Sequence, residues 1–322
     1  MTDFVIEKVP RVRLSGSLLA VFAAACGGVA SNSPPRPAQG SPMATRPFNS
    51  YAFEVSPEIA APPPIDSTPQ ETEEPAGKSA DEAGAPEPLP ATPFFASVAI
   101  DGFPDAVVSL PNGANSARPV LVVLHGMGGR PDANCEAWRH IIDGSGFVLC
   151  LRGQYDPARS LPGDRRYTHV GGAYLRRHVE AGLAALQAQY PGYVDAEKPV
   201  LAGFSLGAEE VALLAQSDPP RFPRVAVLEG GVDVWFSSTI GAFASRGGKR
   251  VLFGCGAAWC SPLALAAAQG IERGGVPAHV VVANVGHTYD PPLQEAIRGE
   301  LAWFFDGDDR WGSALAQASD HP

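Results

Sequence analysis

A serine flanked by glycines is the part of this sequence best suited to chemistry. Residues 203–207 have the sequence Gly-Phe-Ser-Leu-Gly, after the apolar run 199–202 and before the helix-compatible stretch 208–216. A tight turn from strand to helix lifts a serine hydroxyl above the edge of a sheet. Glycines two residues away on each side are needed because a Cβ there would clash. The spacing predicts Ser205 as a nucleophile.

A glycine-rich turn supplies candidate donors for an oxyanion. Residues 125–129, His-Gly-Met-Gly-Gly, follow the apolar run 119–124 directly. Backbone N–H groups in such a turn can face the negative charge that develops on a carbonyl oxygen during acyl transfer. We expect the N–H of Met127 to be one donor and the N–H of Leu206 its partner.

His287 is the candidate general base. It follows the apolar run 278–283 and precedes the last helical pattern. Functional residues of a parallel sheet gather at the carboxyl ends of its strands. An imidazole in that place can accept the proton of Ser205 and return it to the leaving group.

Alternating apolar runs and helical patterns must position these groups. Runs that are apolar on both faces are typical of buried parallel strands. Their alternation with helices predicts an α/β fold with a doubly wound, mostly parallel sheet. The expected strands are 95–100, 106–110, 119–124, 147–151, 199–202, 224–228, 249–253 and 278–283, and the expected helices are 133–142, 173–189, 208–216, 263–273 and 293–305.

The motifs at 125–128, 203–207 and 286–287, in that order, resemble the α/β-hydrolase superfamily. The resemblance covers essentially all of residues 95–305. It implies the α/β-hydrolase fold and acyl transfer with Ser205 as nucleophile and His287 as base, without a cofactor. The interval 229–250 is too short for a large cap domain.

The acid is where this sequence departs from the family pattern. The loop that usually carries it corresponds to residues 254–260, which contain no carboxylate. Some family members carry the acid one strand earlier, where Glu229 is the first candidate here and Asp233 the second. The acid holds the imidazole tautomer, and its loss can cost about four orders of magnitude in rate. A structural role for Glu229, with a Ser-His dyad, stays open.

The N-terminal residues have the features of an export signal. Basic residues precede the short apolar run 18–25, which is too short to span a bilayer, and small residues lead into Cys26. This junction resembles the lipobox of bacterial lipoproteins, although Ala23 replaces the usual leucine. We expect a signal peptide at 1–25 and a lipid on Cys26, with an ordinary secretory signal as the alternative. The protein would be exported to the cell envelope, at the outer membrane or in the periplasm, or secreted.

Residues 26–93 have the composition of a disordered tether. They are rich in proline, alanine and acidic side chains, with too little apolar surface to offset the entropy of ordering. Residues 94–322 suffice for one domain. Most of the net charge of −10 lies in the tether, since residues 66–87 hold seven acidic residues and one lysine. No basic stripe suggests binding to nucleic acid.

Export places the other four cysteines in an oxidising compartment, where two disulfides can form in three connectivities. We favour Cys135–Cys150 and Cys255–Cys260. Metal binding is not expected, because the sequence has neither Cys-x-x-Cys nor His-x-x-x-His spacing.

The substrate class is less defined. The loop 152–172 is polar and arginine-rich and is expected to overhang the site, where it could receive an acidic or polyhydroxylated substrate, or simply be a solvated loop. The leading hypothesis is an exported serine esterase that acts on a small-molecule or polysaccharide ester. The alternatives are a serine peptidase on the same scaffold and a non-catalytic surface binding protein with a degenerate hydrolase fold.

Overall fold

The computed structural model describes residues 87–90 and 95–319. The expected signal peptide 1–25, the lipidation candidate Cys26 and all of the expected tether except residues 87–90 lie outside the described residues. Leu89, in that short segment, packs against the core and donates its N–H to the carbonyl of Ala114 at 2.8 Å. The folded unit therefore includes a few residues that composition assigns to the tether.

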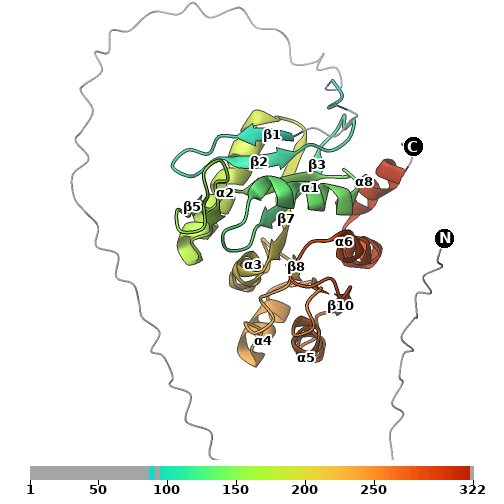
Figure 1. The fold of residues 1–322 in the computed structure, drawn as a ribbon. Coiled ribbons are helices and arrows are strands. Elements are labelled where there is room, and N and C mark those ends of the chain that lie inside the picture. Colours follow the sequence, from blue (N-terminus) through green and yellow to red (C-terminus); the bar gives the residue numbers. More distant parts are fainter. Residues whose placement is uncertain (1–86, 91–94, 320–322) are drawn as a thin grey trace, which may run out of the picture. The chain divides into compact units, whose positions relative to one another are not determined.

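One eight-stranded sheet organises the described part of the chain (Figure 1). Its strand order is β1-β2-β4-β3-β7-β8-β9-β10. Strand β2 is antiparallel to both of its neighbours, and all the other pairs are parallel. The bounds are β1 Phe95–Val98, β2 Ala106–Ser109, β3 Arg118–Leu124, β4 Phe147–Leu151, β7 Val194–Phe204, β8 Arg224–Leu228, β9 Arg250–Cys255 and β10 Ala278–Val282.

Helices cover both faces of this sheet. Side chains of α2, α3, α4 and α5 pack into one hydrophobic core, and those of α1, α6, α7 and α8 pack into the other. The sheet is therefore doubly wound and mostly parallel, as expected. The bounds are α1 Pro131–Ile142, α2 Gly172–Gln189, α3 Leu206–Ser217, α4 Ser237–Ser245, α5 Cys260–Arg273, α6 Pro291–Arg298, α7 Leu301–Phe304 and α8 Asp309–Ser319.

The strands next to the centre are buried along their whole length. Every residue of β3, β4 and β8 is buried, which explains their continuous apolar runs. Between β8 and β9, a stretch that the structure describes in full, the only helix is α4. No cap domain interrupts the fold there.

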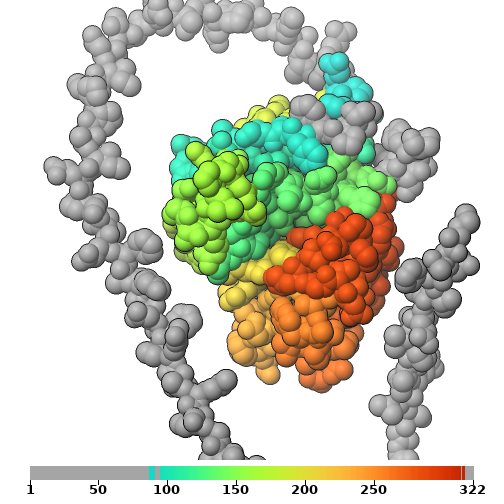
Figure 2. All heavy atoms as spheres, viewed as in Figure 1, coloured from blue at the N-terminus to red at the C-terminus, as the bar shows by residue number. Residues whose placement is uncertain are grey.

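A small hairpin stands beside the main sheet. It consists of β5 (Gln154–Tyr155) and β6 (Tyr167–Thr168), which pair antiparallel. In the space-filling view this hairpin and its connection form the yellow-green lobe beside the blue-green strands β1 and β2 (Figure 2). Within residues 87–90 and 95–319, no helix has the length and apolar content needed to cross a bilayer.

Candidate active site

Ser205 occupies a strained turn between β7 and α3. Its backbone has φ 55° and ψ −119°, a conformation that costs a non-glycine residue free energy. The N–H of Ser205 donates to the carbonyl of Leu228 at 2.8 Å, which ties the turn to the end of β8. A Cβ on Gly203 would lie 2.2 Å from the carbonyl oxygen of Gly207, so this close approach requires glycine. The turn has the geometry expected of a nucleophile elbow.

The two predicted oxyanion donors lie on either side of this serine. Leu206 is the first residue of α3, and Met127 lies in the turn after β3. A Cβ on Gly126, next to Met127, would lie 3.1 Å from the Cβ of Ser205, so the turn closely approaches this serine. Among the described residues, no protein group accepts a hydrogen bond from either N–H. Both are available to a ligand oxygen.

His125 holds the oxyanion turn in place. Its ring is buried, with Nδ1 2.8 Å from the carbonyl oxygen of Gly126, and its Nε2 accepts the N–H of Gly153 at 3.2 Å. Burial lowers the pKa of His125 to about 4, so the ring is neutral with its proton on Nδ1. The sequence placed His125 in the turn, but only its contacts show this supporting role.

His287 is paired with Glu229. Its Nδ1 lies 2.9 Å from Oε2 of Glu229, whose side chain is fully buried. The other carboxylate oxygen, Oε1, accepts the N–H groups of Gly256 and Ala257, the latter at 2.9 Å. These donors hold the carboxylate in one orientation. The second candidate, Asp233, is exposed and makes no hydrogen bond or ion pair within the part of the chain that the structure describes.

The histidine loop reaches across the sheet to the serine turn. The ring of His287 packs against the ring of Phe204, the residue before Ser205, with the two centroids 4.8 Å apart. Phe204 also packs against Tyr289 at 4.6 Å, and Tyr289 accepts the indole N–H of Trp138 at 3.0 Å. The serine, the histidine and Glu229 therefore gather at the same edge of the sheet. Within the described residues neither the hydroxyl of Ser205 nor Nε2 of His287 makes a hydrogen bond, so both are available to a substrate.

The loop after β9 contacts both Glu229 and the loop that carries His287. Besides its contacts with Glu229, this loop accepts a hydrogen bond from Gly286, the residue before His287. The N–H of Gly286 donates to the carbonyl of Gly256 at 3.0 Å. A disulfide between Cys255 and Cys260 closes this loop, and a second disulfide joins Cys135 of α1 to Cys150 of β4. Both expected pairings are confirmed.

Removing either disulfide is expected to lower stability, but only removal of the Cys255–Cys260 bridge is expected to lower activity. Replacing Cys255 and Cys260 by alanine frees the loop that holds Glu229, and small displacements of a catalytic group cost up to about a hundredfold. We expect kcat for an aryl ester to fall at least about tenfold, with a loss of stability of about 2 kcal/mol for this short loop. Steady-state kinetics and thermal unfolding of the two double variants measure both quantities.

The Cys135→Ala/Cys150→Ala variant is the matched control. Its cross-link spans a sequence separation of 15 rather than 5, which gives a larger expected loss of about 3 kcal/mol. It touches neither Glu229 nor His287, so its kcat at a temperature where it is folded is expected to equal that of the wild type. An equal decrease of kcat in both variants contradicts this role of the loop.

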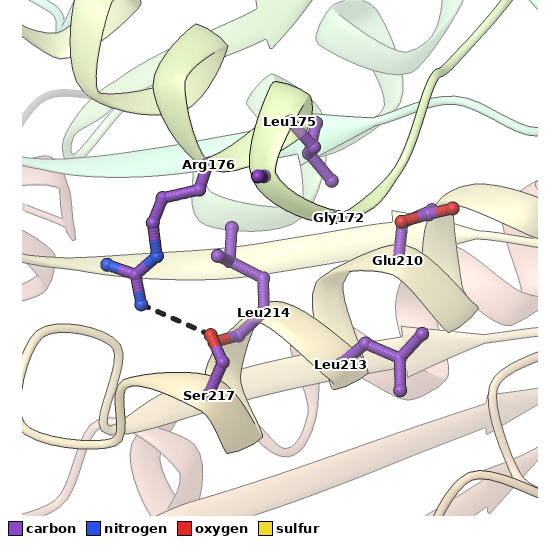
Figure 3. A pocket seen from close by; sticks show the side chains of 8 residues that line it. Gly172, Leu175, Arg176, Glu210, Leu213, Leu214 and Ser217 are labelled. Carbon is purple, nitrogen blue, oxygen red and sulfur yellow. Dashed lines mark hydrogen bonds between the residues drawn. The ribbon is translucent and has the colours of Figure 1, made fainter.

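An apolar groove lies away from these residues, between α2 and α3 (Figure 3). This groove measures about 320 Å³ and is mostly apolar, with Leu175 and Arg176 on α2 facing Leu213 and Ser217 on α3. The guanidinium of Arg176 donates to the hydroxyl of Ser217 at 3.2 Å. None of the candidate catalytic residues lines it, so it is separate from the site at the sheet edge.

No cluster of three or more His, Cys, Asp or Glu side chains suited to a metal ion occurs in the described ranges.

No family model and no curated protein matches the sequence. Similar solved structures include Est1E from Butyrivibrio proteoclasticus, at 13% identity and a TM-score of 0.45, over 66% of this chain and 98% of that one. The S-formylglutathione hydrolase FrmB from Staphylococcus aureus has 13% identity and a TM-score of 0.48, over 68% and 99%. A carboxylesterase from Bacillus cereus has 17% identity and a TM-score of 0.42, over 65% and 93%.

The strand order decides the fold class. A mostly parallel eight-stranded sheet has its second strand antiparallel, a strained serine turn follows β7, and a histidine follows β10. The fold is that of the α/β hydrolases. In such a fold the carboxyl ends of the strands form the functional edge, and Ser205, Glu229 and His287 all lie there.

Proposed function

We propose that this chain is a serine hydrolase that cleaves carboxylic esters through an acyl-enzyme on Ser205. The pairing of His287 with the buried carboxylate of Glu229, beside the strained serine turn, carries the proposal. A carboxylate at Nδ1 holds the proton there and leaves Nε2 unprotonated, so the ring can accept the proton of a serine hydroxyl.

The steps of the reaction follow from these positions. Oγ of Ser205 attacks the ester carbonyl while its proton passes to Nε2 of His287, and the N–H groups of Met127 and Leu206 stabilise the oxyanion. The tetrahedral intermediate collapses as the imidazolium gives its proton to the departing alkoxide. Water, deprotonated by His287, then attacks the acyl-enzyme and releases the acid. Glu229 stabilises the imidazolium in both halves of the reaction.

The openness of the site favours small or chain-like esters. The His287 side chain is 44% exposed, and the nearby residues Met127 and Trp259 are 51% and 49% exposed. Substrates can therefore approach from solvent without the opening of a cap, which fits a small-molecule or polysaccharide ester. Export, with a lipid anchor at Cys26, is part of the same proposal and is supported by the basic and apolar residues that precede this cysteine.

Covalent labelling tests the proposal. A fluorophosphonate probe is expected to modify the folded protein at one site, identified by mass spectrometry as Ser205, with loss of aryl-ester hydrolysis in proportion to labelling. Heat-denatured protein, in which the activated serine no longer exists, is the control and is expected to remain unlabelled. A folded protein that takes up no probe, or takes it up on another serine, contradicts the proposed function and favours a binding protein.

A further inference from the structure

A basic cavity opens next to the oxyanion turn. It has a volume of about 600 Å³ and lies between the start of α1, the end of β4 and the connection within the β5–β6 hairpin. Arg130, Arg152 and Arg165 line it, together with Tyr167 and one acidic residue, Asp132. Three guanidinium groups around one cavity, against a single carboxylate, give it a net positive charge.

Among the described residues, two of these arginines have no acidic partner. Arg130 forms ion pairs with Asp132 and Asp164. Arg152 and Arg165, in contrast, form no ion pair or hydrogen bond with any described residue. Their neighbours in the hairpin, Arg159 and Arg166, are paired with Asp156 and Asp164. The hairpin therefore neutralises part of its own positive charge and leaves two guanidinium groups available at the cavity.

Tyrosine rings support the unpaired guanidinium groups. The guanidinium of Arg152 lies over the ring of Tyr167, 5.4 Å from its centroid, and that of Arg165 lies over Tyr155 at 6.0 Å. Nε of Arg152 is buried and has no acceptor among the described groups. A buried donor without an acceptor is unfavourable, and a ligand oxygen would relieve it. An arginine stacked on a ring keeps its planar fork in a fixed orientation, ready for a carboxylate.

The cavity lies beside the glycine-rich turn 125–129, which approaches Ser205. Arg130 directly follows the oxyanion turn, and the N–H of Tyr167 donates to the carbonyl of Gly129 at 3.1 Å. Arg152 follows β4, which is separated from the serine strand β7 only by β3. Because neighbouring strands lie about 4.8 Å apart, the end of β4, which Arg152 follows, lies roughly 10 Å from the end of β7, which Ser205 follows. One extended substrate can occupy both places.

We propose that this cavity binds a carboxylate of the substrate at a distance from the bond that is cleaved. The proposal rests on the proposed function and adds a substrate class to it, namely esters with a remote anionic group. The arginines hold the carboxylate and leave Ser205, His287 and the oxyanion donors to act on the ester carbonyl.

A pair of matched esters tests this preference. The mono-4-nitrophenyl ester of sebacic acid carries a free carboxylate at about the required distance, and its methyl-capped counterpart is neutral with the same chain. We expect the wild-type protein to favour the anionic ester in kcat/KM by about tenfold or more, as a charge-assisted hydrogen bond permits. This ratio is expected to fall to about one in Arg152→Gln/Arg165→Gln.

Two further variants sharpen the experiment. Arg152→Lys keeps the charge but not the planar fork, so we expect it to restore part of the preference. Arg177→Gln removes an exposed arginine of α2 outside the cavity and is expected to keep the wild-type ratio. Equal kcat/KM values for the two esters in the wild type, or an unchanged ratio in the double variant, overturn the proposal while leaving the proposed hydrolase function intact.

Binding provides a readout that does not depend on hydrolysis. Monomethyl sebacate and dimethyl sebacate can be titrated calorimetrically into full-length Ser205→Ala protein. We expect the monoanion to bind at least about tenfold more tightly than the diester, and the difference to disappear when Arg152 and Arg165 are also replaced by glutamine. If the preference is present but no ester is hydrolysed by the wild type, the cavity assignment stands and the proposed function fails.

Discussion

Replacing Ser205 by alanine is expected to lower kcat for a 4-nitrophenyl ester by about a million-fold. Loss of a triad serine has an effect of about this size, because the acyl-enzyme route no longer exists. The hydroxyl of Ser205 makes no hydrogen bond to any described residue, so its removal leaves the fold intact. Turnover of purified protein, together with its thermal unfolding temperature, measures both effects.

Ser217→Ala is the matched control for this variant. It removes a serine at the other end of the same helix, α3. There the hydroxyl donates a hydrogen bond to the carbonyl of Leu214 and accepts one from the guanidinium of Arg176. We expect it to keep wild-type kcat with a small loss of stability. A Ser205→Ala protein that retains more than about one per cent of the wild-type kcat would contradict a nucleophilic role for this serine.

A glycine at the same position separates strain from catalysis. The φ of 55° at Ser205 costs a residue with a Cβ about 1–2 kcal/mol, and glycine avoids this cost but loses about 0.5–1 kcal/mol in chain entropy. Ser205→Gly is therefore expected to be inactive and as stable as Ser205→Ala or more stable. That combination indicates that the turn carries strain for the sake of the hydroxyl's position.

Local composition was enough to predict most of the sheet. The buried strands β3, β4 and β8 are continuous apolar runs in the sequence. The serine turn is recognisable from its two glycines, which the structure requires because a Cβ at either position would clash with backbone atoms. Helices α4 and α8 and the hairpin strands β5 and β6 had no counterpart among the expected elements, and two of the expected elements differ clearly in extent. Strand β7 begins at Val194 rather than at residue 199. Three of the residues before 199 are charged, so the apolar pattern missed this part, but Val194 and Asp195 pair with the start of β3. The expected helix 293–305 is divided into α6 and α7 around Gly299.

The partner of His287 could not be decided from the sequence, because tertiary contacts determine it. Glu229 and Asp233 are both carboxylates in the same loop after β8. What distinguishes them is a pair of backbone N–H groups from the loop after β9, which bind Glu229. The sequence does not reveal this contact, because every residue except proline supplies a backbone N–H. Likewise, the arginines around the cavity form an obvious cluster in the sequence, but the pairing of Arg159 and Arg166, and not of Arg152 and Arg165, appears only in the fold.

Replacing Glu229 by glutamine is expected to lower kcat by about 10³- to 10⁴-fold with little change in KM. The N–H groups of Gly256 and Ala257 both point at Oε1, so the amide oxygen of glutamine must occupy that place. Its NH₂ group then faces Nδ1 of His287, which can only accept. The ring proton moves to Nε2, the tautomer that cannot take a proton from Ser205, and such a tautomer error costs about four orders of magnitude. Steady-state kinetics on a 4-nitrophenyl ester measures the effect.

Asp233→Asn is the control for the loss of one carboxylate in this loop. Because Asp233 is exposed and has no partner among the described residues, we expect kcat to remain within about twofold of the wild type. Thermal unfolding of Glu229→Gln shows whether the buried amide is tolerated, since a folded but slow enzyme is the expected result. If Glu229→Gln is folded and keeps its kcat while Asp233→Asn is slow, the acid has been assigned to the wrong side chain. If neither variant is slowed at least tenfold, catalysis relies on Ser205 and His287 alone, and the 2.9 Å contact between Nδ1 and Oε2 positions the loop rather than the proton.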